Sequence, residues 1–483
     1  MRGELIQGSL PGLKHVLERV SFYHFSCHSP DFQYGGRDMA NLRAANPSEG
    51  GLEGFVRRTL VPLFLLLVCP PAALVFWHVN KVHLGSFAAF GGEIADKGFF
   101  SAIGSAWEPV MFGTPEAWAI IAVFSAFQLL LIRVVPGKEY RGPETPGGHV
   151  PVYVDNGMRS FVITMATFGG LSWGLGLFHP AIVWHHFGGL IGALNVLALV
   201  VCLALYFKGR FAPSGPDHSH TGNFIFDYYW GTELYPRVLG FDVKQFTNCR
   251  FGMMGWPVIL VSFAAAQGEL TGSISDAMLV SVGIQLVYIA KFFWWETGYL
   301  ASMDIQVDRA GYYICWGCLV WVPAIYTSHT CYMVQNPHTF GPVVATLIFL
   351  AGVAAVFMNY FADAQRQRVR ATDGQTTVWG RKPDLIRAEY TTEKGEQRSS
   401  LLLVSGFWGV SRHFHYLPEI TASFCWTLPA LFDNFLPWFY VIFLTVLLVH
   451  RAFRDEQKCS RKYGEYWVEY KRRVPYKIIP GVL

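Results

Sequence analysis

The sequence predicts an all-α fold, a polytopic membrane helix bundle with about ten transmembrane helices. Of the 483 residues, 52% are hydrophobic and only 15% are charged, whereas soluble domains usually have about 25% charged residues. Apolar runs of the roughly 20 residues that a helix needs to cross a bilayer recur along most of the chain. The formal net charge of +4 is too small to predict a nucleic-acid partner.

The apolar runs divide the chain into three regions. Residues 1–55 are polar and mixed in charge, and we expect them to form an N-terminal extension without a cleavable signal sequence. Residues 56–250 are expected to form the N-terminal transmembrane helices and their cytoplasmic loops, and residues 251–483 the C-terminal transmembrane half. The predicted spans are 59–79, 116–135, 158–178, 181–207, 252–267, 277–300, 311–334, 341–361, 401–430 and 435–450.

Basic residues are concentrated in alternate loops. Lys and Arg are retained on the cytoplasmic side of a membrane, and the pattern fits this rule when both termini are placed there. The opposite loops near 268–276 and 335–340 contain no Lys or Arg, and only the 80–115 loop, with Lys81 and Lys97, departs from the rule. The charge pattern therefore predicts an orientation for the bundle.

The cysteines and histidines predict no metal site. Nine cysteines are scattered along the chain, most of them inside apolar runs, so we expect no disulfide framework. Cys315 and Cys318 are spaced like a redox pair, but packing inside a span is the favoured interpretation. Two histidine pairs, at 185–186 and 218–220, lack a third or fourth ligand at zinc-like spacing.

A polar segment with the sequence GFWGVSRHFHY, at 406–416, interrupts the ninth predicted span. A cation in hydrocarbon costs a few kcal/mol unless it meets a partner or a water-filled cavity. We therefore expect the segment to line a polar pocket at one membrane face. Two more cationic clusters are expected at that face, namely Arg366, Arg368 and Arg370 after the eighth span and Arg451, Arg454 and Lys458 after the tenth.

Together the three clusters predict a site for a polyanion, although basic flanks of the spans are an equal alternative. The chain contains no Gly-rich phosphate-binding motif of the Rossmann or P-loop type. A nucleotide, if one binds, would therefore be held by side chains.

Two carboxylates are candidate proton donors. Glu296 follows the four aromatic residues at 292–295, and a carboxyl group shielded from water by tryptophans is favoured in its protonated form, as a general acid at neutral pH requires. The alternative for Glu296 is a packed or paired carboxylate. Asp455 lies four residues after Arg451 on the same helical face, so a plain ion pair is equally open there.

These residues stand in motifs that resemble the sterol reductase family, membrane enzymes that saturate ring double bonds of sterols with NADPH. The resemblance covers about 143–483. Its blocks include YVDNG at 153–157, GTELYPR at 231–237, FWWET at 293–297, WGRKP at 379–383 and the polar segment at 406–416. Phe407 and Phe414 favour the branch that reduces the C7 double bond, because the C14 branch usually has tryptophan and proline at those places.

The resemblance implies an ionic reduction, in which an acid protonates the alkene and hydride from the nicotinamide traps the carbocation. It implies proton delivery by Glu296 and Asp455. His415 stands where the family usually has asparagine, and its ring is expected to add a titration near neutral pH. The residues implied around NADPH are Arg366, Arg370, Trp408, His415, Arg451, Asp455, Cys459 and Tyr463.

The resemblance also implies the cellular setting. The catalytic half would be 251–483, with the NADPH pocket facing the cytosol and the sterol entering from the bilayer. The membrane would be the endoplasmic reticulum in a eukaryote or the inner membrane in a bacterium. Association with other sterol-biosynthesis enzymes stays open.

Three alternative functions stay open as well. The first is a Δ14 sterol reductase. The second is an isoprenylcysteine-type membrane methyltransferase, against which the cationic residues suited to a 2′-phosphate argue. The third is a non-enzymatic sterol-binding scaffold, in which the acids and the cofactor arginines would not be needed.

Overall fold

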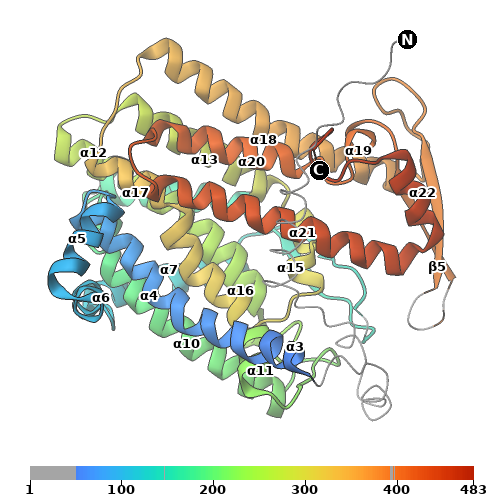
Figure 1. Ribbon diagram of the computed structural model, residues 1–483, viewed down its shortest axis with the longest axis horizontal. Coiled ribbons are helices and arrows are strands. Elements are labelled where there is room, and N and C mark those ends of the chain that lie inside the picture. The colour runs from blue at the N-terminus through green and yellow to red at the C-terminus, as the bar shows by residue number, and fades with distance from the viewer. Residues whose placement is uncertain (1–50, 146, 392–394, 396, 483) are drawn as a thin grey trace.

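The computed structural model describes residues 51–145, 147–391, 395 and 397–482. In this part of the chain, helices form a bundle accompanied by three two-stranded antiparallel hairpins (Figure 1). The predicted all-α membrane bundle is confirmed. Most of the predicted N-terminal extension lies outside the described residues.

Seven helical segments of the described residues are long and apolar enough to cross a membrane, so the chain is a multi-pass membrane protein. A 20-residue helix is about 30 Å long, which matches the hydrocarbon thickness of a bilayer. The segments are Val56–Val82 (η2, Val56–Leu60, and α4, Val61–Val82), α7 (Pro115–Val134), α10 (Phe187–Phe211), Gln245–Thr271 (η4, Gln245–Met253, and α12, Met254–Thr271), α13 (Asp276–Trp294), α18 (Pro342–Ala371) and Leu436–Tyr463 (η7, Leu436–Trp438, and α21, Phe439–Tyr463).

The other three predicted spans are interrupted. Glycine-rich sequence ends the first of them, Pro323 lies inside the second, where it removes a backbone donor, and a polar loop occupies the start of the third. Average hydropathy over a window does not register such breaks. The resulting elements are α8 (Gly157–Gly169) and η3 (Gly170–Gly174); α16 (Tyr312–Trp316), η5 (Gly317–Tyr326) and α17 (Ser328–Gln335); and α19 (Phe407–Val410), α20 (Tyr416–Thr427) and η6 (Leu428–Ala430).

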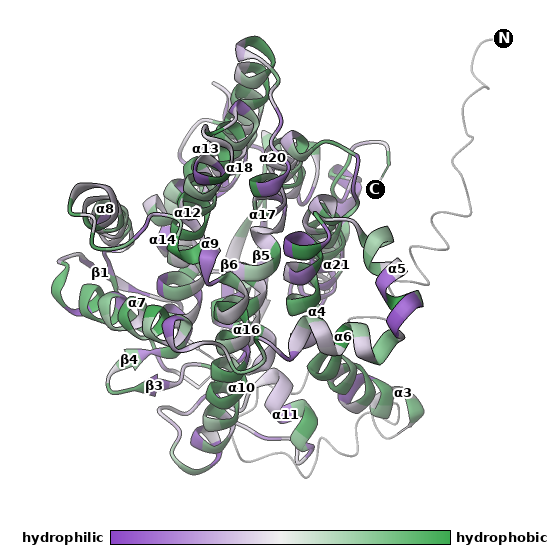
Figure 2. Cartoon of the chain, turned by 90° about the vertical axis from the view of Figure 1, so that its left-hand side faces the viewer, coloured by the Kyte–Doolittle hydropathy of each residue, from purple (hydrophilic) through white to green (hydrophobic). Residues whose placement is uncertain are grey.

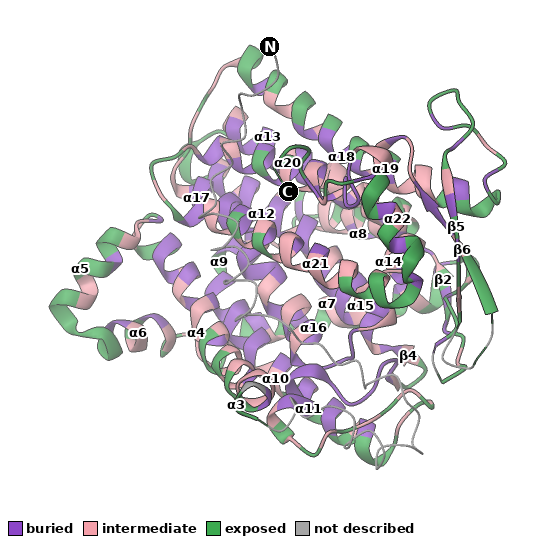
Figure 3. Cartoon of the chain, turned by 45° about the vertical axis from the view of Figure 1, so that its right-hand side comes forward, coloured by how far each residue is buried: buried purple, intermediate pink, exposed green. Residues whose placement is uncertain are grey.

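Shorter elements occupy the two ends of the bundle. Helices α5 (Phe87–Lys97) and α6 (Phe99–Trp107) lie at one end, and the hairpin of β5 (Leu385–Thr391) and β6 (Gln397–Leu403) lies at the other with α22 (Glu465–Arg473) (Figures 1 and 3). The remaining elements are α3 (Leu52–Phe55), α9 (Ile182–His185), α11 (Phe224–Trp230), α14 (Glu296–Leu300), α15 (Met303–Gln306), β1 (Lys138–Arg141) paired with β2 (Val152–Asp155), and β3 (Arg237–Val238) paired with β4 (Phe241–Asp242).

The bundle has an apolar core and an apolar outer surface. One cluster of buried side chains extends from Ala73 in α4 to Ile478, which follows α22, so it includes residues from both predicted halves of the chain. Hydrophobic residues cover much of α7 and α10 in Figure 2. Large apolar side chains on the outward faces include Phe64, Leu67, Val123, Leu347 and Val446. Such faces suit a hydrocarbon solvent, and the division of the chain at residue 250 stays a prediction.

Helix α18 fixes the position of the candidate site. It packs against α13 and α20, and the approach to α13 is close, because a Cβ added at Gly352 would lie 2.5 Å from Cδ1 of Ile284. At its start, the side chain of Asp276 accepts hydrogen bonds from the backbone N–H of Phe340 at 3.0 Å and of Gly341 at 2.7 Å. The last turns of α18 are therefore held at the end of the bundle that carries the β5–β6 hairpin.

Candidate active site

The three predicted cationic clusters lie on elements that meet at this end. The guanidinium carbon of Arg366 in α18 lies 3.9 Å from the ring centroid of Trp408 in α19. The indole N–H of Trp408 donates to the backbone oxygen of Ala362 at 2.7 Å, and Arg366 pairs with Asp363 at 2.8 Å. Stacking and pairing together hold the cation over an aromatic face, where cation and ring attract one another.

Two histidines of the polar segment make ring contacts in this region, His415 with Trp408 and His413 with Tyr416. The ring centroid of His415 lies 5.1 Å from that of Trp408, and the ring of His413 stacks on Tyr416 at 5.5 Å. Both histidines lie outside the seven spans, and burial lowers the pKa of His415 to about 3 and that of His413 to about 4. His415 is therefore neutral at physiological pH, and the expected titration near neutrality is corrected.

The hydroxyl group of Tyr416 is influenced by charged residues from two helices. Burial raises the pKa of Tyr416 to about 12, the charges of Arg451 and Arg366 oppose that rise, and the charge of Asp455 adds to it. The ring of Tyr416 lies 4.2 Å from that of His415 and 5.5 Å from that of His413, and Nδ1 of His413 lies 3.9 Å from the carboxylate of Asp455 in α21. Tyr416 is the last residue of the polar segment at 406–416, and the sequence indicated no role for it.

Arg451 is paired with a carboxylate outside its own helix. Its guanidinium lies 3.1 Å from the carboxylate of Asp304 in α15, and Arg454 of the next turn lies 3.4 Å from Asp308. The buried ammonium group of Lys244 donates to the backbone oxygens of Ile305 at 2.5 Å and of Asp308 at 2.8 Å. The segment after α15 is thus fixed against the end of α21.

Asp455 is left without a close cation as a result. The ion pair with Arg451 that the spacing allowed is not formed. Among the described residues, the nearest charged or polar partners of its carboxylate are Nδ1 of His413 and Sγ of Cys459, each at 3.9 Å. Its side chain is 32% exposed. A carboxylate that is partly open and weakly partnered remains available to a ligand or a proton.

The last two predicted cofactor residues lie toward the β5–β6 hairpin. The Nε of Arg370 donates to the backbone oxygen of Leu401 at 3.3 Å. The ring of Tyr463 packs edge-on against Tyr390 at 5.6 Å. Tyr470 of α22 links this region to α19, because its hydroxyl donates to the backbone oxygen of Trp408 at 3.3 Å.

Glu296 lies in a different environment from the one expected. Arg250 and Glu296 are both fully buried and form a two-point ion pair, in which Nη2 of Arg250 lies 2.8 Å from Oε2 of Glu296 and Nη1 contacts Oε1. Nη2 also donates to Oδ1 of Asn156 at 2.8 Å, whereas the neighbouring Trp294 is exposed. The partner of the carboxylate is therefore a guanidinium that lies 46 residues away in the chain. The catalytic role of Glu296 stays a prediction.

A line of polar side chains leads from the polar segment into the bundle. The side-chain amide of Asn359 donates to the backbone oxygen of His415 at 2.9 Å, and Lys291 donates to Asn359 at 2.8 Å. The ammonium of Lys291 lies 4.8 Å from the ring centroid of Tyr288, whose hydroxyl donates to Glu419 at 2.6 Å.

Tyrosine and glutamate form a polar pair inside an aromatic enclosure. The ring of Tyr288 lies 5.3 Å from Trp426 and 5.9 Å from Trp256, and both Tyr288 and Glu419 keep part of their surface accessible. Sequence reasoning missed this pair. The available signal was that Glu419 is the one carboxylate in the apolar run at 401–430.

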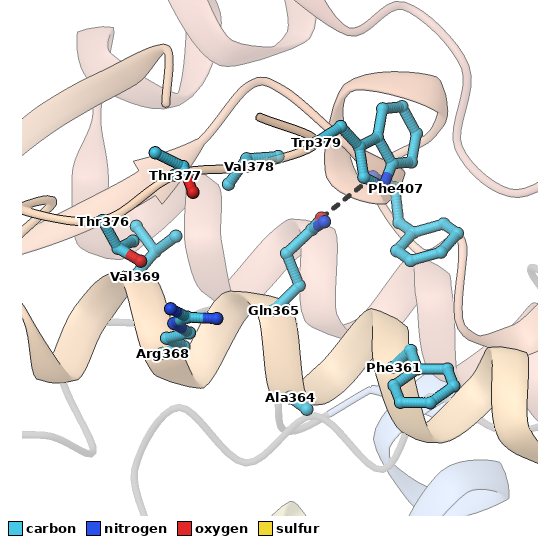
Figure 4. A pocket seen from close by; sticks show the side chains of 10 residues that line it. All are labelled: Phe361, Ala364, Gln365, Arg368, Val369, Thr376, Thr377, Val378, Trp379 and Phe407. Carbon is cyan, nitrogen blue, oxygen red and sulfur yellow. Dashed lines mark hydrogen bonds between the residues drawn. The ribbon is translucent and has the colours of Figure 1, made fainter. Parts of the chain in front are cut away.

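A cavity of about 430 Å³ lies on the opposite side of α18 (Figure 4). The side-chain oxygen of Gln365 in its wall accepts a hydrogen bond from the backbone N–H of Phe407 at 3.0 Å. Its lining comprises Phe361, Ala364, Gln365, Arg368, Val369, Thr376, Thr377, Val378, Trp379 and Phe407. None of the eight predicted cofactor residues is in this lining, so the cavity adjoins the candidate site and is separate from it.

Possible metal ligands also come together in the described residues. His179, His185 and Glu269 place their ligand atoms within 4.8 Å of one another, as do His78, His83 and Glu93. The carboxylate of Glu269 thus supplies the third group that His185 lacks in the sequence, from a position 84 residues away.

Comparison with known proteins identifies the relatives of this chain. Residues 63–483 match the model of the ergosterol biosynthesis ERG4/ERG24 family. The 7-dehydrocholesterol reductase of Arabidopsis thaliana is 49% identical over 87% of this chain and 96% of its own length. The 7-dehydrocholesterol reductase of Xenopus laevis is 37% identical over 76% of this chain and 79% of its own length.

A relative that is named for a different double bond is similar over an equal share of the chain. The Delta(14)-sterol reductase of Methylotuvimicrobium alcaliphilum is 32% identical over 87% of this chain and 94% of its own length. The family match and the lengths of these alignments agree with the resemblance seen in the motifs. The chain therefore belongs to the ergosterol biosynthesis ERG4/ERG24 family of sterol reductases.

Proposed function

We propose that this chain reduces the C7 double bond of a Δ5,7 sterol with NADPH. The observation that carries the proposal is the cluster in which Arg366 lies over Trp408, His415 lies between Trp408 and Tyr416, and Asp455 lies beside His413. This cluster stands at the start of a polar line that ends among aromatic side chains at Tyr288. The charged end of this line, which we call the mouth, suits the phosphates of a dinucleotide. The aromatic side chains around Tyr288 suit a sterol. The relatives named 7-dehydrocholesterol reductase support the choice of double bond.

Unsatisfied polar atoms at the mouth fit a bound nucleotide. Nδ1 of His415 and Nε2 of His413 are buried and have no hydrogen-bond partner among the described residues. An unpaired buried polar atom costs about 1–3 kcal/mol, which an amide or hydroxyl of NADPH would recover. Arg366, Arg370 and Arg451 would hold phosphates, with Trp408, Cys459 and Tyr463 beside them. When bound, NADPH supplies the hydride.

The proton that is added to the sterol must come from an acidic group of the protein. The carboxylate of Asp455 lies 3.9 Å from His413, and it is partly open to solvent from which it could be reprotonated. Glu296 would have to exchange its guanidinium partner before giving up a proton. The hydroxyl of Tyr288, backed by Glu419, is a further donor in the aromatic enclosure. We therefore propose Asp455 as the first acid, with Glu296 as a second one that also has a structural role.

We also propose the membrane and the membrane face at which the reaction takes place. The nucleotide site would face the cytosol, in the endoplasmic reticulum of a eukaryote or the inner membrane of a bacterium, and the sterol would enter from the bilayer. A Δ14 sterol reductase is the second candidate, because the Delta(14)-sterol reductase of Methylotuvimicrobium alcaliphilum is 32% identical over 94% of its length. Association with other sterol-biosynthesis enzymes stays a prediction.

Sterol selectivity tests the proposed reaction. Purified protein given NADPH with a Δ5,7 sterol and a Δ8,14 sterol in the same detergent should reduce only the first, as followed by gas chromatography of the products. Preferential reduction of the Δ8,14 sterol would replace the proposal by its second candidate. Reduction of neither sterol, with NADPH unspent, would contradict both.

Removing the charge of Glu296 should lower stability and turnover together. Glu296→Gln leaves Arg250 as a buried charge without its partner, which costs about 3–5 kcal/mol, so the thermal unfolding temperature should fall. The double variant R250Q/E296Q removes both charges and should recover much of that stability. Its turnover per folded molecule should stay roughly a hundredfold below wild type, the size of a general-acid contribution. Full recovery of turnover in the double variant would show that Glu296 acts only through Arg250.

Arginines on one face of α18 should control the use of NADPH. Charge-assisted hydrogen bonds contribute about 1.5–3 kcal/mol each, so R366A/R370A should raise the KM for NADPH by at least about tenfold and leave the KM for the sterol unchanged. Arg368 lines the separate cavity on the other side of α18, and R368A is therefore the matched control. An equal effect of R368A on the KM for NADPH would mean that the nucleotide binds elsewhere.

His415 should not titrate during catalysis. Since burial lowers its pKa to about 3, the pH profiles of kcat for wild type and H415N should coincide between about pH 5 and 8. Stability should behave differently. The unfolded chain binds a proton at His415 below its ordinary pKa of about 6.5, so stability is lost as pH falls from there toward 3. H415N should lose less stability over this range, and an activity limb near pH 6.5 that disappears in H415N would contradict the account.

A further inference from the structure

Two histidines and a glutamate converge at the end of the bundle opposite the candidate active site. His78 lies in the last turns of α4, His83 follows that helix, and Glu93 lies in α5, which Figures 1 and 3 place far from the β5–β6 hairpin. Nε2 of His83 lies 2.7 Å from Oε2 of Glu93, and Nε2 of His78 lies 3.6 Å from the same oxygen. All three ligand atoms lie within 4.8 Å of one another.

Nε2 of His78, the nitrogen that faces Glu93, makes no hydrogen bond within the described residues. The residue is 8% exposed, and its Nε2 is buried without a hydrogen-bond partner in the described part of the chain. A buried polar atom without a partner is costly, and native proteins rarely retain one that has no purpose. A ligand bound between the three side chains would satisfy it.

Neighbouring side chains hold the three residues in place. The ring of Phe90 lies 5.9 Å from that of His78 and 5.7 Å from that of His83, which limits rotation of both imidazoles. The second oxygen of Glu93, Oε1, accepts hydrogen bonds from Ser105 at 3.1 Å and Lys97 at 3.0 Å. These contacts leave Oε2 directed at the histidines, as the outer shell of a metal site directs its ligands.

We propose that His78, His83 and Glu93 form a binding site for a divalent transition metal of the zinc class. Two imidazoles and one carboxylate are a recurrent zinc ligand set, and water fills the fourth position. Tetrahedral bonds of about 2.0–2.1 Å place ligand atoms roughly 3.3 Å apart. The two imidazole nitrogens lie 2.7 and 3.6 Å from Oε2 of Glu93, within about 0.6 Å of that separation, and all three ligand atoms lie within 4.8 Å of one another. A neighbouring positive charge opposes a metal there, that of Lys97, whose side chain is 56% exposed and can turn into water.

The metal would join α4 to the projecting pair of α5 and α6. In α5 and α6 only Phe90 and two alanines are fully buried, and Phe87, Ile94 and Ile103 are partly buried against the core. The contact through Glu93 is therefore a polar attachment that adds to this apolar packing. The site is distant from the nucleotide residues and rests on observations independent of the proposed reaction. A bound metal should therefore order residues 84–107 without altering the active site directly.

The exposed trio of His179, His185 and Glu269 must be removed before the metal is counted. Its imidazoles stack at 5.4 Å, all three side chains are at least 40% exposed, and it could take up zinc loosely. We would strip the full-length H179A/H185A protein with a chelator and titrate it with zinc against a fluorescent competitor. The same titration on this background with H83A, and separately with E93Q, tests the ligands.

The proposal expects one tightly bound zinc per chain in the H179A/H185A protein and at least about tenfold weaker binding after H83A or E93Q. E93Q keeps the shape of the side chain, so it guards against a loss of folding in H83A. Zinc should also slow amide hydrogen exchange in 84–107 in the H179A/H185A protein, and Co²⁺ in its place should give a tetrahedral absorption spectrum. Less than one zinc per chain, or equal affinity in the E93Q protein, would overturn the proposal.

Discussion

The buried ion pair between Arg250 and Glu296 joins three parts of the chain. In the interior of a membrane protein, an unpaired charge is costly. Arg250 belongs to η4, Glu296 begins α14, and Asn156, which precedes α8, accepts the third hydrogen bond of the guanidinium. A Cβ added at Gly157 would lie 2.3 Å from Oε2 of Glu296, so the backbone there also fits around the carboxylate. Because α14 leads directly into α15, the pair fixes the origin of the segment that carries Asp304.

The ion pair between Asp304 and Arg451 in turn affects which charges of the site are left without a partner. Arg451 is neutralised from another helix, and this leaves Asp455 as the partly open carboxylate at the mouth. Phosphates would enter among Arg366, Arg370 and Arg451, whereas the polar line through Asn359 and Lys291 leads away to Tyr288 and Glu419. In the proposed reaction, the charged end of this line of contacts would hold the nucleotide and the aromatic end would hold the sterol.

Sequence reasoning predicted the parts of this arrangement that depend on local pattern. Continuous apolar runs gave the seven spans, and motif spacing gave the cationic residues of α18, the polar segment and α21. The breaks in three further spans were not visible in hydropathy, since Pro323 and the glycines at 169–176 change little in an average. The partners of Glu296 and Arg451 could not be predicted, because Arg250 and Asp304 lie 46 and 147 residues away in the chain. The neutral state of His415 likewise depends on burial by elements distant in sequence.

The origin of the two added hydrogens tests the central claim most directly, since the account assigns one to the nucleotide and one to an acid of the protein. With NADPH deuterated at the nicotinamide C4 in ordinary water, mass spectrometry of the reduced sterol should show one deuterium. With unlabelled NADPH in D₂O, it should show one deuterium at the neighbouring carbon. Absence of label from the nicotinamide in the first experiment, or two deuterium atoms per sterol in the second, would contradict hydride transfer to a protonated alkene.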